Sequence, residues 1–514
     1  MTASASPLAP AIEPAPPEAP PAAAWRTDTI TESVLILMAL TVVQRMVGFV
    51  RAVLFCRWLD PADLGRWDMA YSFILIAPPL LILAVPAAFG RYVEHYRRLG
   101  HLRTLICRTA IWCAVSSVVG AGLVAVFHGQ FAALIFGEPG QGRLMLLVAL
   151  SLPLVVLMNY QTELLTALRK VRVVSSMQLA SSLAFALVGV GMLIAGQQSA
   201  ESIVLAFTAG TVLAVGIAAV ALSATWRAIP RPAERLQSTT LWGKLLPFVV
   251  WVTVTSFMGH LFAVADRYMI IHFSGISPEG ALGLVGEYHS SRIVPLLLMS
   301  VAMLLAGMLT PHLSADWEAG RRHTVIRRLN LFLKLLGFVL TGTGVAVLLA
   351  APWLFDVAFA GKFAGGEEVL PWALTYCIWF GLILAAQMYL LCAEQARLAS
   401  LALGAGLAVN VVLNLLLLPR LGLLGAVLAT AAAHAVALLL VLAFCRWSGL
   451  AIDRGTWLIM ALPVVLNLGP WIALAVMGAV ALAAVRDRAL LDEEERALLA
   501  DSARGLLARL HGGG

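Results

Sequence analysis

Residues 422–445 read GLLGAVLATAAAHAVALLLVLAFC and contain no Asp, Glu, Lys or Arg. A helix needs about 20 apolar residues to cross the hydrocarbon core of a bilayer. This run is far longer than the roughly 10 residues of a transmembrane β-strand, and its polarity does not alternate. Lipid offers the backbone no hydrogen-bond partners, so a membrane-spanning helix is the conformation that remains.

Similar apolar runs fill most of the 514-residue chain, which is 61% hydrophobic and only 12% charged and has a mean hydropathy of +0.90. About 25% of an ordinary soluble domain is charged. The composition therefore excludes a soluble enzyme, a nucleic-acid-binding module and a fully disordered chain. It predicts an all-α polytopic membrane protein with about fourteen transmembrane helices, near 30–55, 65–92, 104–127, 142–168, 174–195, 201–226, 243–273, 283–312, 325–351, 367–393, 397–418, 422–445, 455–467 and 470–485.

The distribution of basic residues supports this number and predicts an orientation. The connections that face the same side as residue 30 carry 20 Lys and Arg, and the opposite connections carry 5. Cytoplasmic loops are enriched in Lys and Arg, so we expect both termini in the cytoplasm and the protein in the cytoplasmic (inner) membrane. A wrong helix count would scramble this alternation along the chain.

Five segments are expected along the chain. Residues 1–28 are rich in Ala and Pro and should form a disordered cytoplasmic tail. Residues 29–241 and 242–447 should each form a six-helix half, 448–486 should add two helices, and 487–514 should form an amphipathic cytoplasmic tail.

An internal repeat relates the two halves. Gly65-Arg-Trp67 matches Gly286-Glu-Tyr288 at an offset of 221 residues, and Gln161-Thr-Glu-Leu-Leu-Thr-Ala167 matches Gln387-Met-Tyr-Leu-Leu-Cys-Ala393 at an offset of 226. Six helices is an even number, so the two copies should have the same orientation and be related by a pseudo-two-fold axis along the membrane normal. Two such halves are typical of an alternating-access transporter whose site lies between them.

Patterns of catalysis or metal binding are missing from the sequence. It contains no GxxxxGK[ST], HExxH or GxSxG motif, and its six cysteines are scattered. Membrane-embedded His260 and His434 are interpreted as packed, hydrogen-bonded residues. We expect a protein that is not an enzyme and needs no cofactor or metal. The short outward loops argue against a membrane glycosyltransferase or ligase.

Ionisable side chains inside the predicted helices are the candidate functional residues, because each costs at least about 2.5–3.5 kcal/mol at the bilayer centre. They are Arg45, Arg51, Glu163, Asp266, Arg267 and Arg292. Several arginines lining one cavity suit an anionic substrate, especially a phosphate, which the guanidinium group binds through two parallel hydrogen bonds. Arg51 and Arg267 lie near helix ends and could instead extend to the interface, an option that mid-helix Arg45 lacks.

Short motifs, in order along residues 30–485, resemble the multidrug/oligosaccharidyl-lipid/polysaccharide exporter superfamily. They are Gln44-Arg-Met-Val-Gly-Phe-Val-Arg51, Ala265-Asp-Arg-Tyr268, Tyr288-His-Ser-Ser-Arg292, Pro311-His-Leu-Ser314, Asn410-Val-Val-Leu-Asn414 and Pro419-Arg-Leu-Gly-Leu-Leu-Gly-Ala-Val-Leu-Ala-Thr430. The motifs that begin at Gln44, Tyr288 and Pro311 are similar to the lipid II flippase family. The motifs that begin at Ala265, Asn410 and Pro419 are similar to O-antigen and polysaccharide flippases. Where the lipid II flippases have a basic pair late in helix 2, this chain reads Pro79-Leu-Leu-Ile-Leu83. That departure favours the polysaccharide branch.

The resemblance implies a flippase that moves a polyprenyl-diphosphate-linked oligosaccharide across the membrane for polysaccharide or lipopolysaccharide synthesis. Arg45, Arg51 and Arg292 would bind the diphosphate, with Arg267 as a weaker member. Asp266 or Glu163 would couple an ion or neutralise an arginine. The expected partners are the lipid-linked glycan, membrane lipid and polysaccharide assembly proteins, without nucleic acid, and the expected state is a monomer. The alternatives are lipid II flipping, multidrug or cation antiport, and a scaffold with a degenerate cavity.

Overall fold

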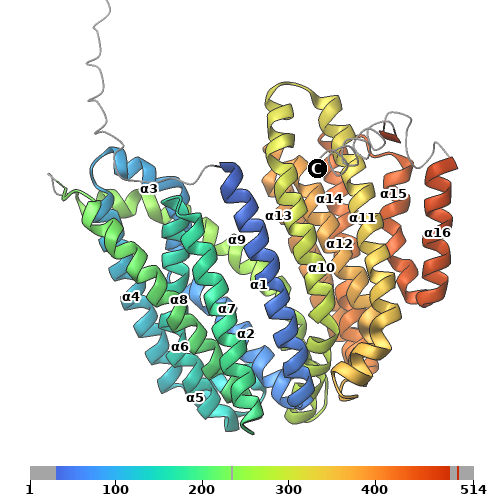
Figure 1. Ribbon diagram of the computed structural model, residues 1–514, viewed down its shortest axis with the longest axis horizontal. Coiled ribbons are helices and arrows are strands. Elements are labelled where there is room, and N and C mark those ends of the chain that lie inside the picture. Colours follow the sequence, from blue (N-terminus) through green and yellow to red (C-terminus); the bar gives the residue numbers. More distant parts are fainter. Residues whose placement is uncertain (1–29, 233–235, 487–494, 497–514) are drawn as a thin grey trace, which may run out of the picture.

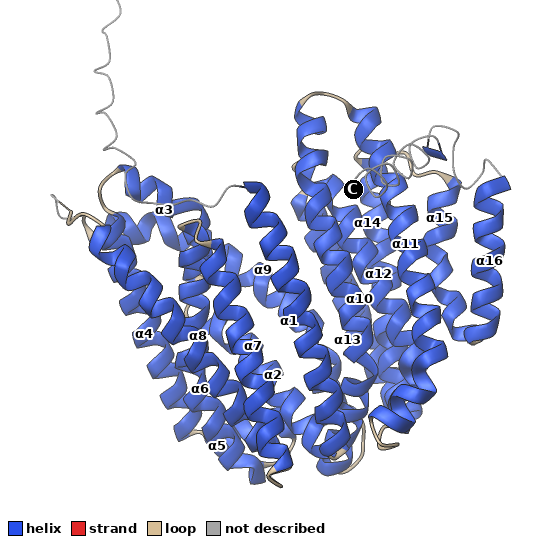
Figure 2. Cartoon of the chain, viewed as in Figure 1, coloured by secondary structure: helices blue, strands red, loops and turns tan. Residues whose placement is uncertain are grey.

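The computed structural model describes residues 30–232, 236–486 and 495–496, and nearly all of them are helical, with no strand in these ranges (Figure 2). The predicted tails at 1–28 and 487–514 lie outside the described residues, apart from Glu495 and Arg496. The elements are α1 (Ile30–Trp58), α2 (Pro61–Leu81), η1 (Val85–Ala88), α3 (Phe89–Arg98), α4 (Leu102–Val126), α5 (His128–Phe136), η2 (Pro139–Gln141), α6 (Gly142–Ala167), α7 (Val171–Ile194), α8 (Ala200–Ala228), α9 (Ser238–Phe273), α10 (Pro278–Glu318), α11 (Arg322–Pro352), η3 (Trp353–Ala358), α12 (Ala364–Cys392), α13 (Ala396–Leu421), α14 (Leu423–Trp447), α15 (Arg454–Ala461), η4 (Leu462–Leu468) and α16 (Pro470–Arg486).

The predicted membrane fold is confirmed. Ten helices of the described chain are long and apolar enough to cross a membrane, and the bent pair formed by α2 and the segment Val85–Arg98 makes an eleventh. Helix α1 and the shorter apolar helices Arg454–Leu468 and Pro470–Ala484 occupy the places of the other three predicted spans. Each predicted span therefore has its counterpart in the structure.

The second predicted span is the one whose course differs from the expectation. Instead of a continuous helix over 65–92, α2 ends at Leu81, and the chain bends by 60° before α3. Pro78 and Pro79 in its last turn lack the N–H groups that would continue the hydrogen-bond ladder, and Leu83 and Ala84 adopt positive φ values of 51° and 44°. The uncharged stretch that departs from the lipid II flippase pattern thus forms the break.

The two halves lie side by side, with α1 between the helices of the first half and α10 (Figure 1). We call the end where α1 begins and α16 ends the basic end, because it carries the arginine-rich connections 91–108 and 321–328. At the opposite end the halves are joined by polar contacts, namely Arg66 Nη2–Glu279 Oε1 (3.1 Å), Lys362 Nζ–Asp60 Oδ1 (3.2 Å) and His272 Nε2–Leu134 O (2.7 Å).

Helices α2 and α10 cross at two glycines that are equivalent in the internal repeat. A Cβ atom on Gly65 would lie 1.9 Å from the carbonyl oxygen of Leu282, and one on Gly286 would lie 1.9 Å from the carbonyl oxygen of Pro61. Leu282 and Pro61 are themselves 221 residues apart, as the glycines are. The contact is therefore reciprocal, as a pseudo-two-fold axis through this crossing requires.

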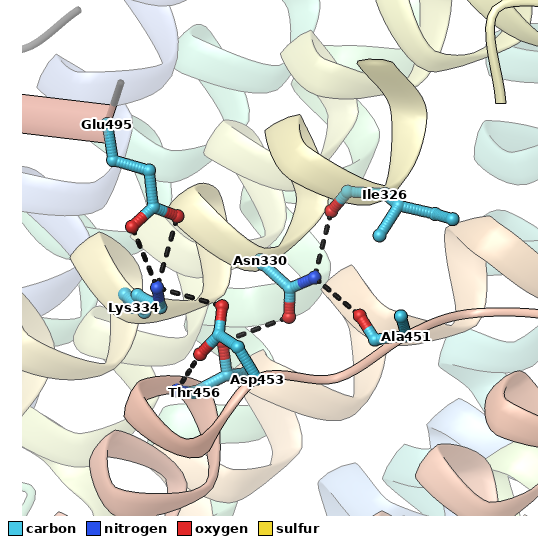
Figure 3. A network of polar contacts seen from close by, with 7 residues as sticks. All are labelled: Ile326, Asn330, Lys334, Ala451, Asp453, Thr456 and Glu495. Atoms are coloured by element: carbon cyan, nitrogen blue, oxygen red, sulfur yellow. Dashed lines mark hydrogen bonds and ion pairs between the residues drawn. The ribbon is translucent and has the colours of Figure 1, made fainter. Parts of the chain in front are cut away.

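A polar network fixes α15 to α11 at the basic end (Figure 3). The buried Lys334 Nζ lies 2.8 Å from Asp453 Oδ2 and 2.8 Å from Glu495 Oε2. Beside it, Asn330 Nδ2 donates to the carbonyl of Ala451, and Thr456 Oγ1 donates to Asn330 Oδ1. Lys334 is thus buried in α11 and neutralised by carboxylates.

Candidate functional site

A buried ion pair joins the two halves between α2 and α9. Arg267 Nε of α9 lies 2.7 Å from Asp68 Oδ2 of α2, and both side chains are at least nine-tenths buried. The N–H at Nε is not directed at that oxygen, so this contact is an ion pair without a hydrogen bond. Arg267 also donates from Nη1 to Ser72 Oγ at 2.7 Å, one helical turn after Asp68. The alternative in which Arg267 extends to the membrane surface is therefore wrong.

Asp68 has a second neighbour from the other half, His289 of α10. The His289 Nδ1 atom lies 2.9 Å from Asp68 Oδ1, and the His289 side chain is partly exposed. The carboxylate thus contacts one residue from each of the first two helices of the second half. Separating α2 from α9 and α10 would break both contacts at once.

Asp266 lies next to Arg267 in sequence but belongs to a different cluster, inside the second half. Its Oδ1 accepts hydrogen bonds from Asn410 Nδ2 (2.7 Å) and Asn414 Nδ2 (3.3 Å) of α13. Its Oδ2 accepts one from the Tyr288 hydroxyl (2.8 Å). Asn410 Nδ2 also donates to Thr430 Oγ1 of α14, and the buried Oδ1 of Asn414 has no hydrogen-bond partner among the described residues. Two carboxamides of α13 and one hydroxyl of α10 therefore donate to the same carboxylate of α9.

Arg292 lies between these two clusters. It is 8% exposed, and its guanidinium carbon lies 4.8 Å from the centre of the Tyr288 ring. Its buried Nε has no hydrogen-bond partner in the described chain. Tyr288 is held in place by its bond to Asp266 and by the Tyr376 hydroxyl, which donates to it at 3.2 Å. Arg292 thus has donor capacity left, whereas Arg267 is neutralised by Asp68.

The two arginines of α1 lie apart from these clusters. Arg51 is half-buried, and its guanidinium carbon lies 4.0 Å above the Phe185 ring of α7. Arg45 is exposed, and within the described ranges no carboxylate forms an ion pair with it. Glu163 near the end of α6 is likewise exposed. The structure therefore brings Asp266, Arg267 and Arg292 into one region and leaves Glu163 outside it.

The sequence reasoning missed part of this site. Asp68, Ser72 and His289 were not among the candidate residues, although Asp68 is an ionisable residue within a predicted span and met the same criterion as Asp266. Asp68 and His289 are also 221 residues apart, the offset of the repeat. The repeat alone could have placed them opposite each other across the axis.

In chemical terms the region balances two buried carboxylates, Asp68 and Asp266, against two buried guanidinium groups, Arg267 and Arg292. Across the described residues, no group of three or more His, Cys, Asp or Glu side chains is placed to hold a metal ion. Arg45 and Arg51 of α1 lie outside this balance and form no ion pair with a carboxylate in the described chain.

Comparisons with known proteins agree with the predicted superfamily. A family model described as Polysaccharide biosynthesis protein matches residues 30–317. No curated protein matches the sequence. Among solved structures, the lipid II flippase MurJ in an inward closed conformation is similar over 88% of this chain and 99% of its own, with a TM-score of 0.67 and 13% identity.

Two transporters of the same superfamily are also similar. An inward-facing multidrug resistance MATE family transporter aligns over 81% of this chain and 98% of its own, with a TM-score of 0.60 and 10% identity. A transporter from Pyrococcus furiosus, described as having a binding pocket of reverse polarity, aligns over 81% and 94%, with a TM-score of 0.55 and 10% identity. At these identities the likeness shows the shared fold alone.

Proposed function

Because the chain belongs to the polysaccharide biosynthesis protein family, within the multidrug/oligosaccharidyl-lipid/polysaccharide exporter superfamily, we propose that it translocates a polyprenyl-diphosphate-linked oligosaccharide across the cytoplasmic membrane. The protein would act as a monomer with both termini in the cytoplasm, and the flipped glycan would supply polysaccharide or lipopolysaccharide synthesis. A diphosphate headgroup cannot enter hydrocarbon without a large desolvation cost, so it needs a cationic path between the halves.

The observation that carries this proposal is the state of the arginines on α1. Arg45 is exposed in the middle of a membrane helix with no ion pair in the described chain, and Arg51 is held on an aromatic face that leaves its N–H groups available. A guanidinium group without a counter-charge inside the membrane raises the free energy of the protein. A phosphate ligand would supply that counter-charge and accept its hydrogen bonds. Helix α1 packs on α7 and also contacts α10. Its arginines are therefore placed to meet a ligand between the two halves.

Alternating access would proceed through the crossing of α2 and α10. In the present state this crossing joins the halves at the end opposite the basic end, through Gly65, Gly286 and the Asp68 contacts. The ligand would enter from the basic end, and the crossing would open to release it on the other side. The two halves would rock about the pseudo-two-fold axis.

The energy source we propose is a cation gradient that acts through Asp266. The carboxylate is held by N–H and hydroxyl donors, and the neighbouring Asn414 Oδ1 has no hydrogen-bond partner in the described chain. A carboxylate and an amide oxygen are ligands of the kind that a hard cation prefers. Exposed Glu163 lacks such surroundings, so we assign coupling to Asp266 rather than to Glu163.

The substrate is tested by reconstituting the protein in vesicles with fluorescent polyprenyl-diphosphate lipids. The proposal expects translocation of an oligosaccharide-linked lipid to exceed that of lipid II. Faster movement of lipid II would favour the alternative, lipid II flipping. Equal, slow movement of both lipids alongside efflux of an organic cation would indicate a multidrug antiporter.

A further inference from the structure

A cavity outside the site described above opens at the basic end of the second half. It has a volume of about 530 Å³ and lies where α10 and α11 meet the last turns of α12 and α14. Three aromatic residues, Trp317, Tyr389 and Trp447, and one charged residue, Arg322, dominate its lining. Volumes of about 300–1,000 Å³ are typical of small-molecule sites.

Arg322 supplies an anion-binding group to this cavity. Its guanidinium carbon lies 3.2 Å from the centre of the Trp317 ring. In the part of the chain that the structure describes, no carboxylate forms an ion pair with it, because the nearby Asp316 is engaged by Arg321 and Arg328. Arg322 is also the first residue of α11, where the helix dipole adds partial positive charge. Both features favour a bound phosphate.

The lining residues at the ends of α12 and α14 have the features of a site for an organic cation. Tyr389 lies in the last turn of α12, and Trp447 is the last residue of α14, so two helix C-termini with partial negative charge point to this region. The Tyr389 hydroxyl donates to Ser448 O at 3.3 Å, which fixes the ring, and Trp447 is 78% exposed. Aromatic faces together with helix C-termini attract an ammonium group.

We propose that this cavity binds a zwitterionic lipid headgroup of the phosphoethanolamine type. The phosphate would contact Arg322, and the ammonium would lie against Trp447 and Tyr389. Trp and Tyr side chains concentrate at the interface between membrane and water, which places the cavity at headgroup depth. The ligand is a resident lipid of the leaflet at the basic end and differs from the transported glycan lipid.

The test measures lipid binding to the purified full-length protein by native mass spectrometry, with phosphatidylethanolamine and phosphatidylglycerol compared at equal concentration. Arg322→Gln should weaken phosphatidylethanolamine binding at least about tenfold, because a charge-assisted contact to phosphate is lost. Trp447→Leu should weaken it about threefold or more through loss of the aromatic contact. Arg420→Gln, an exposed arginine outside the cavity lining, is the matched control and should bind as the wild type does.

Several results would overturn the proposal. One is wild-type affinity in both cavity variants. Another is phosphatidylglycerol binding as tightly as phosphatidylethanolamine, since only the latter carries the ammonium. A third is full displacement of the lipid by inorganic phosphate, which would identify a free-phosphate site. A melting temperature measured for each variant separates loss of binding from loss of folding.

Discussion

Asp68 and His289 contact each other across the axis that relates the two halves of the chain, with Oδ1 and Nδ1 2.9 Å apart. They occupy equivalent positions in the internal repeat, as do the nearby Gly65 and Gly286. Equivalent residues of two parallel copies can touch only where they lie close to the axis. This pair therefore marks the position at which the halves are held together in the present state.

Asp68→Asn should weaken the contact of α2 with α9 and α10 that holds the two halves together at this end. The change leaves buried Arg267 without its carboxylate, and breaking a buried ion pair costs about 3–5 kcal/mol. We expect the α2–α10 crossing to open more often and the fully buried Cys56 at the end of α1 to react faster with a membrane-impermeant maleimide. The assay uses a protein in which the other five cysteines are replaced. An unchanged labelling rate would contradict the role assigned to Asp68.

Gly65→Ala and Gly286→Ala should have similar effects. Each added Cβ would lie 1.9 Å from a carbonyl oxygen of the opposite helix, so the helices must separate. Overpacking of this kind costs about 1–3 kcal/mol, which shifts the equilibrium between the two access states by about 5- to 150-fold. Gly283→Ala, on the same helix α10 but with no atom within 4 Å of its Cβ, is the control. Distances between spin labels on the two halves would report the shift. Unchanged distances in the Gly65→Ala variant would show that α2 and α10 do not pack tightly at this glycine.

Asp266→Asn should uncouple transport from its driving gradient. An asparagine keeps the shape of the side chain but removes the negative charge that would attract a cation. Translocation should then become insensitive to an imposed cation gradient, whereas Glu163→Gln should retain the wild-type response. The measurement compares flipping rates in vesicles with and without the gradient. Persistent gradient dependence in the Asp266 variant would rule out this residue as the coupling site.

Lys334→Met should lower the melting temperature more than Glu495→Gln. Loss of the lysine leaves two carboxylates facing each other, and breaking a buried ion pair in this way costs about 3–5 kcal/mol of stability. Loss of Glu495, in contrast, leaves Lys334 paired with Asp453. The double variant should recover part of the loss, because it removes one of the two carboxylate charges that face each other. Wild-type melting temperatures for both single variants would show that the network contributes little stability, and equal losses would contradict the larger role assigned to Lys334.

The sequence was sufficient to predict the fold and insufficient to predict the pairing of its charges. Apolar runs and basic connections predicted every span, because lipid imposes helix on any long apolar segment. Arg267 illustrates the limit. Its partner Asp68 is 199 residues away in sequence and comes close only through the crossing of α2 and α10. Four arginines counted along the chain therefore suggested a more cationic site than the structure contains.

The break after α2 has a local cause that the sequence also carried. Pro78 and Pro79 indicate a bend in the helix. The residues on both sides of them are apolar, however, and this favoured the prediction of one long span. Arg45 could be placed in a membrane helix from its position alone. That it remains without an ion pair in the described chain depends on which helices surround it, and this requires the structure.

The most direct test of the account is the rate at which Arg45→Gln and Arg51→Gln proteins translocate a polyprenyl-diphosphate-linked oligosaccharide in reconstituted vesicles. A charge-assisted hydrogen bond to phosphate contributes about 1.5–3 kcal/mol, so we predict a loss of at least about tenfold in each variant. Arg420→Gln should flip at the wild-type rate, and all three proteins should insert and melt normally. Wild-type translocation by both α1 variants would show that these arginines do not bind the diphosphate.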